Sequence, residues 1–297
     1  MELMMKLAVV GPTASGKTRL ATALAKLTGA TIINGDPFQS LEGLAIGTGQ
    51  PTSEELDGQS NKGYGCFPLS IHLNPKDFAS SVNAWMKNHP AIICVTGSGL
   101  YLRGIWNQFS PLPEVPISVI NRLRERTEQV GSAILHKELA TIDPDRSREI
   151  HPNDRARIER ALALYEVSGV LPSRLLRGVP LEVPPEWKVI ILDPPRELIR
   201  NSIQHRIHRQ ISSGWLDEIS FLKAQGYESD IRRLRPLGYE TLMDEASLAV
   251  AQDLITIETQ QYAKRQSTWF RHQIKNALRL ESPPFNPLSL IQDLGLS

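Results

Sequence analysis

The sequence predicts an α/β protein, with a parallel sheet core flanked by helices and a small all-helical insert. Three observations support this fold class. Short apolar runs alternate with helical patterns along most of the chain, which is typical of parallel sheets. A glycine-rich segment joins the first apolar run to the first helical pattern. Two proline clusters bracket a segment that carries helical signals alone.

The composition indicates a globular chain that can bury a full core. The 297 residues are 41% hydrophobic and 22% charged, and the mean hydropathy is -0.23. The apolar runs fall far short of the roughly 20 residues of a membrane span, so we expect no membrane contact and a cytoplasmic location. A net charge of +1 excludes a globally basic nucleic-acid binder but is compatible with a local basic patch. Cys66 and Cys94 are too few for a disulfide framework or a four-ligand metal site.

Four short apolar runs are predicted to be the strands of the core: residues 7–10, 31–34, 91–95 and 189–192. A helical pattern over 19–27 separates the first two strands. The last region, from 247 to about 280, is predicted to form one or two helices that end in a basic stretch. We therefore assign residues 1–116 and 179–297 to the core.

The remaining segment, 117–178, is predicted to be the helical insert. Prolines at 111, 113 and 116 precede it, and prolines at 180, 184 and 185 follow it closely. A first helix is expected over 117–130, ended by Gly131. Ser132 is the expected cap of a second helix that reaches about residue 142. A third helix is expected to begin after Asn153 or Asp154 and to end before residue 169.

The segment GPTASGKT at residues 11–18 matches the phosphate-loop motif GxxxxGK[ST] in full. Backbone N–H groups and a helix N-terminus would face an anion there, Lys17 would add a positive charge, and the Thr18 hydroxyl could reach a Mg²⁺. The alternative is an ordinary glycine turn. The candidate phosphate-binding residues are Gly11, Pro12, Thr13, Ala14, Ser15, Gly16, Lys17 and Thr18, with Thr18 also the candidate metal ligand.

Asp36 follows the second predicted strand, where ligands bind in doubly wound sheets. It is a candidate general base, acting directly or through a metal-bound water. Gly-Asp-Pro is also a favoured turn sequence, so a turn aspartate explains the pattern equally well. The segment TGSGLY at 96–101 follows the third strand, and its small residues would let a backbone and a hydroxyl approach a ligand.

Further motifs follow the phosphate loop in a fixed order. They are GTGQPTSEEL at 47–56, TGSGLY at 96–101, HPND at 151–154 followed by RI and RAL, LGYE at 237–240, and YAKRQ at 262–266 followed by TWFR. This combination resembles the tRNA dimethylallyltransferase family over nearly the whole chain. The chain departs from the family pattern at Pro37, Gln50 and Gln260.

The resemblance implies a P-loop-type core and a prenyl transfer. Dimethylallyl diphosphate would bind the phosphate loop with Mg²⁺, and the amino nitrogen of adenosine 37 in tRNA would attack its first allyl carbon. Asp36 matches the family's general base, Ser98 matches a residue that holds the diphosphate, and Arg206 matches an arginine that stabilises the departing diphosphate. The insert would clamp the anticodon stem-loop, and we expect the protein to act as a monomer.

Candidate tRNA-binding residues lie beside Asp36, in the insert and in the basic region near the C-terminus. Cations there would neutralise phosphates, and an aromatic ring could stack on an unpaired base, although a solvated helix face is the simpler alternative. The candidates are Pro37, Phe38, Gln39, Arg157, Arg160, Lys264, Arg265, Gln266 and Arg271.

Three further predictions concern residues close to these candidates in the sequence. Trp269 is expected to be a core residue. The cluster Arg232, Arg233 and Arg235 is equally compatible with RNA contact and with a surface loop. One arginine among positions 155, 157 and 160 is expected to pair with Glu159 or Glu166.

Three other functions share parts of this pattern. A small-molecule P-loop kinase would have the same loop and early aspartate, but it has no place for the motif at 262–271. An adenylate isopentenyltransferase, which prenylates a free nucleotide, would not need the helical insert. A non-catalytic RNA-binding protein with a vestigial loop is the third alternative.

Overall fold

A computed structural model describes residues 5–71, 73–109, 111–176, 181–281 and 286–295 of the chain. The chain divides into two compact units, one formed by residues 1–108 and 181–297 and the other by residues 109–180. The segment predicted as the insert lies inside the second unit. Its predicted end at residue 178, and the proline at 180, lie outside the described residues.

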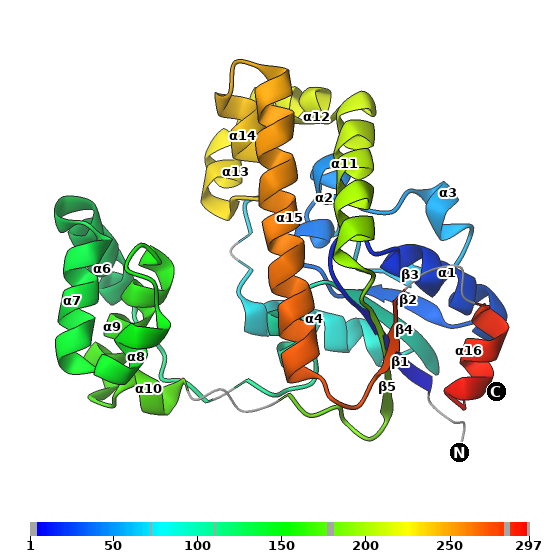
Figure 1. Cartoon of the computed structure of the whole chain (residues 1–297), viewed down its shortest axis with the longest axis horizontal. Coiled ribbons are helices and arrows are strands. Elements are labelled where there is room, and N and C mark those ends of the chain that lie inside the picture. Colours follow the sequence, from blue (N-terminus) through cyan, green and yellow to red (C-terminus); the bar gives the residue numbers. More distant parts are fainter. Residues whose placement is uncertain (1–4, 72, 110, 177–180, 282–285, 296–297) are drawn as a thin grey trace. The chain divides into compact units, whose positions relative to one another are not determined.

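A parallel sheet of six strands forms the centre of the first unit (Figure 1). Its order is β3-β2-β4-β1-β5-β6, and each pairing is parallel. The strands are β1 (Met5–Val10), β2 (Thr31–Asn34), β3 (Asn61–Lys62), β4 (Ala91–Thr96), β5 (Trp187–Leu192) and β6 (Leu278–Leu280). Because the carboxyl ends of β1, β2 and β4 meet at one edge, the phosphate loop, Asp36 and the segment after residue 96 come together there.

The four predicted strands are confirmed, and two further strands were missed. Strand β3 has two residues and β6 has three, which is too short for a recognisable periodicity. The prediction that helix continues to about residue 280 was wrong. A single helix, α15 (Leu248–Gln273), ends before Ile274, and the chain then joins the sheet beside β5. Leu278 and Leu280 pack there against the buried cluster on one face of the sheet.

Apolar layers cover both faces of the sheet. Along β1, Leu7 and Val9 belong to one cluster and Ala8 and Val10 to the other, and the alternation follows from the two-residue period of a strand. Helices α1 (Lys17–Thr28) and α16 (Pro287–Asp293) contribute to the first layer, and α4 (Pro75–Met86) and α5 (Gly99–Ile105) to the second. Such double burial is the usual environment of a parallel sheet.

A third buried cluster lies beyond the carboxyl edge of the sheet and is mostly helical. It packs Trp215 against Tyr239, with ring centroids 5.4 Å apart, and both side chains are fully buried. Its long helices are α11 (Arg196–Ser212) and α15, which lie side by side (Figure 1). The shorter elements of this region are η1 (Phe38–Ser40), α2 (Ala45–Thr48), α12 (Trp215–Ala224), α13 (Glu228–Leu234) and α14 (Tyr239–Asp244). The short helix α3 (Ser53–Leu56) packs instead on α1 and adds Leu56 to the first layer.

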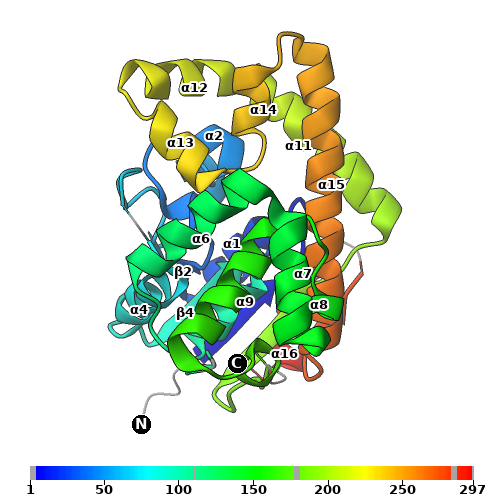
Figure 2. The same ribbon diagram turned by 90° about the vertical axis from the view of Figure 1, so that its left-hand side faces the viewer.

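The second unit is helical throughout its described residues and has its own core. Its helices are α6 (Ile117–Val130), α7 (Ser132–Ile142), α8 (Pro144–Glu149), α9 (Arg155–Ser168) and α10 (Pro172–Leu175). Helices α6, α7 and α9 pack together around Leu123, Leu139 and Ile158 (Figure 2). Of the two proposed caps of α9, Asp154 accepts from the backbone N–H of Arg157, so Asp154 is the cap. The prediction that Ser132 caps α7 was wrong, because Ser132 is the first residue of that helix and Gly131 precedes it without a side-chain cap.

Two expectations from composition concern the chain as a whole. In the described part of the chain, no helix combines the length and the apolar character that a membrane crossing requires. Cys66 is exposed, Cys94 is buried, and both are free thiols.

We expect Asp143→Ala to destabilise the helical unit. The carboxylate of Asp143, which is 1% exposed, accepts from the backbone N–H groups of Arg146 (3.1 Å) and Ser173 (2.7 Å), so it joins α8 to α10. Losing both bonds should lower the free energy of unfolding by about 1–3 kcal/mol. Hydrogen exchange across residues 143–176 of the full chain measures this loss.

The matched control is Asp145→Asn, because the ion pair of Asp145 with Arg148 is exposed and should contribute less than about 1 kcal/mol. Burial works to raise the pKa of Asp143, but the bonds from Ser173 and Arg146 hold it below its ordinary value. The stabilisation is therefore present above the pKa of the unfolded carboxyl and is lost as the pH falls below about 4. Equal exchange in both variants would contradict the role of Asp143.

Candidate active site

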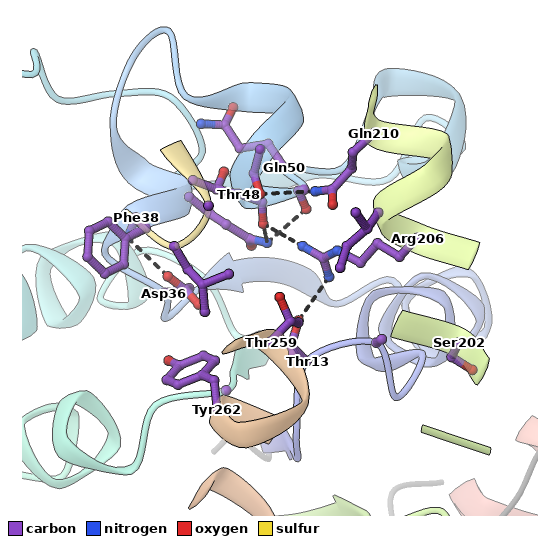
Figure 3. A pocket seen from close by; sticks show the side chains of 18 of the residues that line it. Thr13, Asp36, Phe38, Thr48, Gln50, Ser202, Arg206, Gln210, Thr259 and Tyr262 are labelled. Atoms are coloured by element: carbon purple, nitrogen blue, oxygen red, sulfur yellow. Dashed lines mark hydrogen bonds between the residues drawn. The ribbon is translucent and has the colours of Figure 1, made fainter. Parts of the chain in front are cut away.

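A cavity of about 1390 Å³ opens at the carboxyl edge of the sheet (Figure 3). The phosphate loop from Thr13 onward and Asp36 form one side of its wall. The segment 45–52, helix α11 and helix α15 contribute the other sides. The structure therefore brings together, in one cavity, segments that lie far apart in the sequence.

The phosphate loop leaves β1 in a conformation that requires glycine at its first position. Gly11 has φ 148°, and a Cβ there would lie 2.2 Å from the carbonyl oxygen of Leu192. Gly16, with φ 85°, begins α1 in the left-handed region. The Ser15 hydroxyl lines the cavity, is buried, and has no hydrogen-bond partner within the described residues. A buried hydroxyl without a partner suits an oxygen of a bound ligand.

Lys17 begins α1 and lies beneath the loop. Its Nζ donates to the carbonyl of Pro12 at 2.6 Å. Burial, and then the nearby Arg206 guanidinium, lower the pKa of Lys17 to about 7, against the opposing effect of the Asp36 carboxylate. A phosphate bound at this position would favour the protonated ammonium.

Arg206 extends from α11 to the phosphate loop, 193 positions away in the sequence. Its Nη1 donates to the Thr13 hydroxyl at 3.1 Å, and its Nη2 donates to the carbonyl of Thr48 at 2.8 Å. Burial lowers the pKa of Arg206, and the Asp36 carboxylate opposes this effect. The two bonds fix the plane of the guanidinium beside the loop, where it can contact an anion.

Asp36 satisfies both interpretations of its sequence context. Its Oδ1 accepts from the backbone N–H of Phe38 at 3.0 Å, as a turn aspartate does, and its carboxyl also lines the cavity. Asn34 fixes the turn, because it accepts from the Asp36 N–H and donates to the Asp36 carbonyl. Burial raises the pKa of Asp36, although the Phe38 N–H and Lys17 act in the opposite direction. A raised pKa suits a carboxylate that takes up a proton.

Ser98 does not form part of the cavity wall. It precedes the first residue of α5, and its backbone N–H donates to the Thr96 hydroxyl at 3.0 Å. Thr96 in turn donates to the carbonyl of Gly35, so it joins the ends of β4 and β2. Ser98 was predicted to hold the diphosphate, but Thr96 and Gly97 are the residues of this loop that line the cavity.

Gln266 was predicted to contact tRNA, but it is buried and its amide is used inside the protein. Its Oε1 accepts from the Thr13 N–H at 2.8 Å, and its Nε2 donates to the Gly97 carbonyl at 2.8 Å. Gln266 therefore connects the phosphate loop to the loop after β4. This role depends on a contact between residues 253 positions apart, which no local pattern reveals.

Two more of the predicted tRNA contacts are occupied by internal interactions. Arg271 forms a two-point ion pair with Asp193, with its Nε 2.5 Å from one carboxylate oxygen and its Nη2 3.1 Å from the other. Pro37 is buried. Burial disfavours RNA contact for Gln266 and Pro37, whereas the Arg271 side chain is 57% exposed beside Asp193 and its contact with tRNA stays a prediction.

The other candidates near Asp36 and on α15 remain accessible. Phe38 and Gln39 line the cavity, and the Gln39 amide donates to the carbonyls of Thr48 and Gly49. Arg265 also lines the cavity, with its guanidinium 5.8 Å from the centre of the Tyr262 ring. Lys264 is exposed on the same helix. Trp269 packs against a core cluster, as predicted, and a Cβ on Gly99 would lie 2.2 Å from it.

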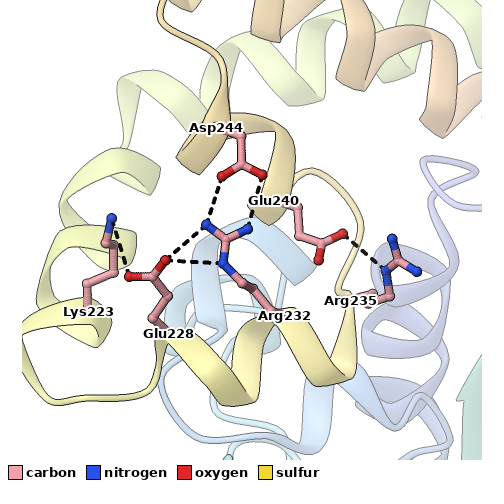
Figure 4. A network of polar contacts seen from close by, with 6 residues as sticks. All are labelled: Lys223, Glu228, Arg232, Arg235, Glu240 and Asp244. Atoms are coloured by element: carbon pink, nitrogen blue, oxygen red, sulfur yellow. Dashed lines mark hydrogen bonds and ion pairs between the residues drawn. The ribbon is translucent and has the colours of Figure 1, made fainter. Parts of the chain in front are cut away.

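The arginines at 232, 233 and 235 form ion pairs, and Figure 4 shows those of Arg232 and Arg235. Arg232 lies between Glu228 and Asp244, and Arg235 pairs with Glu240. Arg233 pairs with Asp230 and also donates to the carbonyl of Leu69. Arg232 and Arg233 thus lie on helix α13 and not in a loop, and their bonds join α13 to α14 and to the core. These bonds favour a structural role over RNA contact.

Three arginines near the start of α9, at positions 155, 157 and 160, differ in their exposure and in their ion-pair partners. Arg155 pairs with Glu159 at 2.6 Å and with Glu128 at 3.1 Å, which confirms one of the two expected pairings. Arg157 is 68% exposed and has only a 3.4 Å contact with the cap Asp154. Arg160 is exposed. Of these three arginines, the two that are exposed are the two proposed to bind tRNA.

Several residues that hold the walls of the cavity were not predicted from the sequence. Gln210 and Glu218 bind the backbone of α2, and Tyr239 donates to Glu218. Tyr239 and Tyr262 belong to the motifs LGYE and YAKRQ, which could have drawn attention to them. Gln210 and Glu218 lie outside those motifs, and no signal in the sequence identified them.

Comparisons with known proteins agree with the predicted resemblance. The sequence model of a family described as IPP transferase matches residues 39–273, and one described as isopentenyl transferase matches residues 4–64. A tRNA dimethylallyltransferase of Nitrobacter hamburgensis is 34% identical over 276 residues, which are 90% of this chain and 87% of that protein. One from Geobacter sulfurreducens is 30% identical and matches 90% of this chain and 89% of that protein.

Solved structures show the same fold. The crystal structure of a tRNA isopentenylpyrophosphate transferase from Bacillus halodurans has a TM-score of 0.68 at 26% identity, over 98% of this chain and 94% of that chain. A eukaryotic dimethylallyltransferase acting on tRNA has a TM-score of 0.75 at 20% identity, over 98% and 76% of the respective chains. These similarities confirm the predicted fold class.

We expect Gln266→Ala to weaken the binding of inorganic diphosphate and to leave tRNA affinity nearly unchanged. The substitution leaves the Thr13 N–H and the Gly97 carbonyl without their partner, which should lower the free energy of unfolding by about 1–3 kcal/mol. Calorimetric titration with diphosphate, filter binding of tRNA and chemical denaturation measure the three quantities. Gln252→Ala is the control, since Gln252 lies on α15 outside the cavity wall. A selective loss of tRNA affinity would restore the original assignment of Gln266.

Proposed function

The chain belongs to the IPP transferase family, and we propose on that premise that it is a tRNA dimethylallyltransferase. In this reaction a dimethylallyl group moves from dimethylallyl diphosphate to the exocyclic amino nitrogen of adenosine 37 in tRNA. The observation that carries the proposal is the meeting of Lys17, Asp36 and Arg206 in one cavity beside the phosphate loop. These groups supply cations for a diphosphate and a carboxylate for a proton.

The leaving group sets the main electrostatic demand of the reaction. As the bond between the allyl carbon and the diphosphate oxygen breaks, negative charge collects on the diphosphate. Positive charge on the allyl fragment is delocalised, so stabilising the diphosphate lowers the barrier most. We assign this task to Lys17, to the backbone N–H groups of the loop and to Arg206, whose orientation is fixed by Thr13 and Thr48.

Asp36 would complete the transfer. The adenine nitrogen forms a bond to the allyl carbon and must lose one proton, which the Asp36 carboxylate accepts. One carboxylate oxygen is held by the Phe38 N–H, and this fixes the orientation of the group. Bringing the base into the cavity requires its extrusion from the RNA stack, at a cost of a few kcal/mol.

Mg²⁺ is the proposed cofactor, and the residues present fit a site that relies on the substrate. Among the described residues, no cluster of three or more histidine, cysteine, aspartate or glutamate side chains could hold a metal ion. Mg²⁺ commonly takes one or two protein ligands together with phosphate oxygens and water. The Thr18 hydroxyl lines the cavity and would serve as the protein ligand. When bound, the ion neutralises charge on the diphosphate.

The insert is proposed to hold the anticodon stem-loop through Arg157 and Arg160, and Lys264 and Arg265 of α15 are proposed as further tRNA contacts. We propose a monomer as the active form. A free-nucleotide isopentenyltransferase is the alternative with some support, because a model described as isopentenyl transferase matches residues 4–64. The match over 39–273 extends through the insert and favours tRNA.

The function is tested by incubating the protein with labelled dimethylallyl diphosphate and Mg²⁺, and with either unmodified tRNA or AMP. Label in tRNA is the expected result. Label in AMP alone would indicate the free-nucleotide activity, and label in neither would remove the prenyl-transfer assignment.

We expect Asp36→Asn to reduce kcat by at least about 10²-fold, because the amide cannot accept the proton. Since burial raises the pKa of Asp36, the wild-type rate should fall as the pH decreases through that raised pKa. The variant should lose this acidic limb of the profile. Near-normal turnover would leave Asp36 with its turn-capping role alone.

Arg157→Ala and Arg160→Ala should each weaken tRNA binding and reduce the slope of log affinity against log salt by about one. Arg155→Ala is the control on the same helix, because Arg155 is occupied by Glu159 and Glu128 and should leave the slope unchanged. Filter binding at several salt concentrations measures all three slopes. Equal slopes for every variant would show that RNA is held elsewhere, most directly at Lys264 and Arg265.

A further inference from the structure

Helix α2 is a single turn whose backbone is held by side chains from other elements. It spans only Ala45–Thr48, so most of its N–H and C=O groups have no partner within the helix. It also forms one wall of the cavity, opposite the phosphate loop (Figure 3). Its position therefore depends on contacts from outside, and those contacts are specific.

Glu218 of α12 binds the amino end of α2. Its Oε2 accepts from the Ile46 N–H at 2.6 Å, and its Oε1 accepts from the Gly47 N–H at 3.2 Å. The same Oε1 accepts from the Tyr239 hydroxyl at 2.6 Å. Burial, and next the Glu218 carboxylate, raise the pKa of Tyr239, so Tyr239 remains a donor. The carboxylate thus accepts three hydrogen bonds, two of them from α2.

Gln210 of α11 binds the carbonyls of the same turn. Its Nε2 donates to the carbonyls of Ile46 (2.6 Å) and Gly47 (3.0 Å). Gly47 is pressed against the aromatic pair below it, since a Cβ there would lie 2.2 Å from Trp215 and 2.5 Å from Tyr239. Helix α2 is therefore fixed by its N–H groups, by its carbonyls and by close packing.

The carboxyl end of α2 contacts Arg206. The Thr48 carbonyl accepts from Arg206 Nη2 at 2.8 Å, and a Cβ on Gly49 would lie 2.3 Å from that nitrogen. Gln210 stands one helical turn after Arg206 on α11, so both residues bind the same turn of α2. A shift of α2 would move the carbonyl that orients the guanidinium.

We infer that Glu218 is a positioning residue for Arg206: it holds α2 so that the Thr48 carbonyl directs the guanidinium toward the departing diphosphate. This inference rests on the proposed function. Glu218 itself contacts neither the phosphate loop nor any of the groups assigned to the chemistry. Its effect on the reaction passes through the backbone of α2.

The number of hydrogen-bond donors around residue 218 explains why a glutamate is needed there. Three donors converge on Glu218, and a carboxylate offers acceptor oxygens on both sides. In Glu218→Gln the shape is kept, but one oxygen becomes an NH₂ group that faces a donor. The substitution therefore tests hydrogen bonding with little change in volume.

The experiment is a double-mutant cycle of Glu218→Gln with Arg206→Lys. The wild type, both single variants and the double variant are assayed for kcat with tRNA and for binding of inorganic diphosphate by calorimetry. We expect Glu218→Gln to lower kcat by roughly 10- to 100-fold in the wild type, as a displaced catalytic group does. In the Arg206→Lys background the same change should cost less than about threefold, because residues that act together are non-additive.

Two controls separate positioning from general destabilisation. Asp217→Asn removes a charge from the first turn of the same helix, where the side chain is exposed, and should leave kcat unchanged. Thermal unfolding of each variant shows whether a loss of rate accompanies a loss of folded protein. If Glu218→Gln does not fold, Tyr239→Phe and Gln210→Ala enter the same cycle, since each removes a different bond around α2.

The outcomes are distinct. An equal loss of kcat from Glu218→Gln in both backgrounds, or a loss explained by unfolding at the assay temperature, would overturn the positioning role. A wild-type protein that transfers no prenyl group would refute the proposed function. The diphosphate affinities of the four proteins would still decide whether Glu218 and Arg206 are coupled.

Discussion

Two half-buried cations, Lys17 and Arg206, lie beside the Asp36 carboxylate, and most features of the site follow from the cost of this arrangement. Removing a charge from water costs several kcal/mol unless hydrogen bonds and opposite charges compensate. Here the carbonyls of Pro12 and Thr48 accept from the cations, and the Phe38 N–H donates to Asp36. Positive charge remains in excess within the cavity. The site is therefore electrostatically prepared for an anion, and a diphosphate would meet that requirement.

The carbonyls that stabilise these cations belong to short elements that cannot hold themselves in place. Helix α2 is one turn long, and its geometry is determined by Gln210 and Glu218. The phosphate loop is likewise connected by Gln266 to the loop after β4. The same hydrogen bonds therefore stabilise the helical layer and orient the reactive groups. A substitution far from the cavity can change the chemistry by breaking one of these bonds.

Arginines with similar sequence contexts have different roles in this chain. Arg155, Arg232 and Arg271 are bound to carboxylates, two of which lie well away from them in sequence, whereas Arg157 and Arg160 are exposed. Asp36 shows a related ambiguity, because one carboxylate can cap a turn and still face a cavity. For each arginine, the partners that it meets in the folded protein decide whether it forms an ion pair or stays exposed.

The sequence by itself determined the features that depend on neighbours along the chain. These are the strands at 7–10, 31–34, 91–95 and 189–192, the phosphate loop, and the helices at 117–130 and 132–142, whose periodicity and the glycine between them are local signals. Only the tertiary structure decided the brief strands β3 and β6, the internal role of Gln266, the ion pair of Arg271 with Asp193, and the hydrogen bonds of Glu218 to α2. The physical reason is that hydrogen bonds and ion pairs between distant segments exist only after the chain has folded, and a pattern of residue types does not specify which donor meets which acceptor.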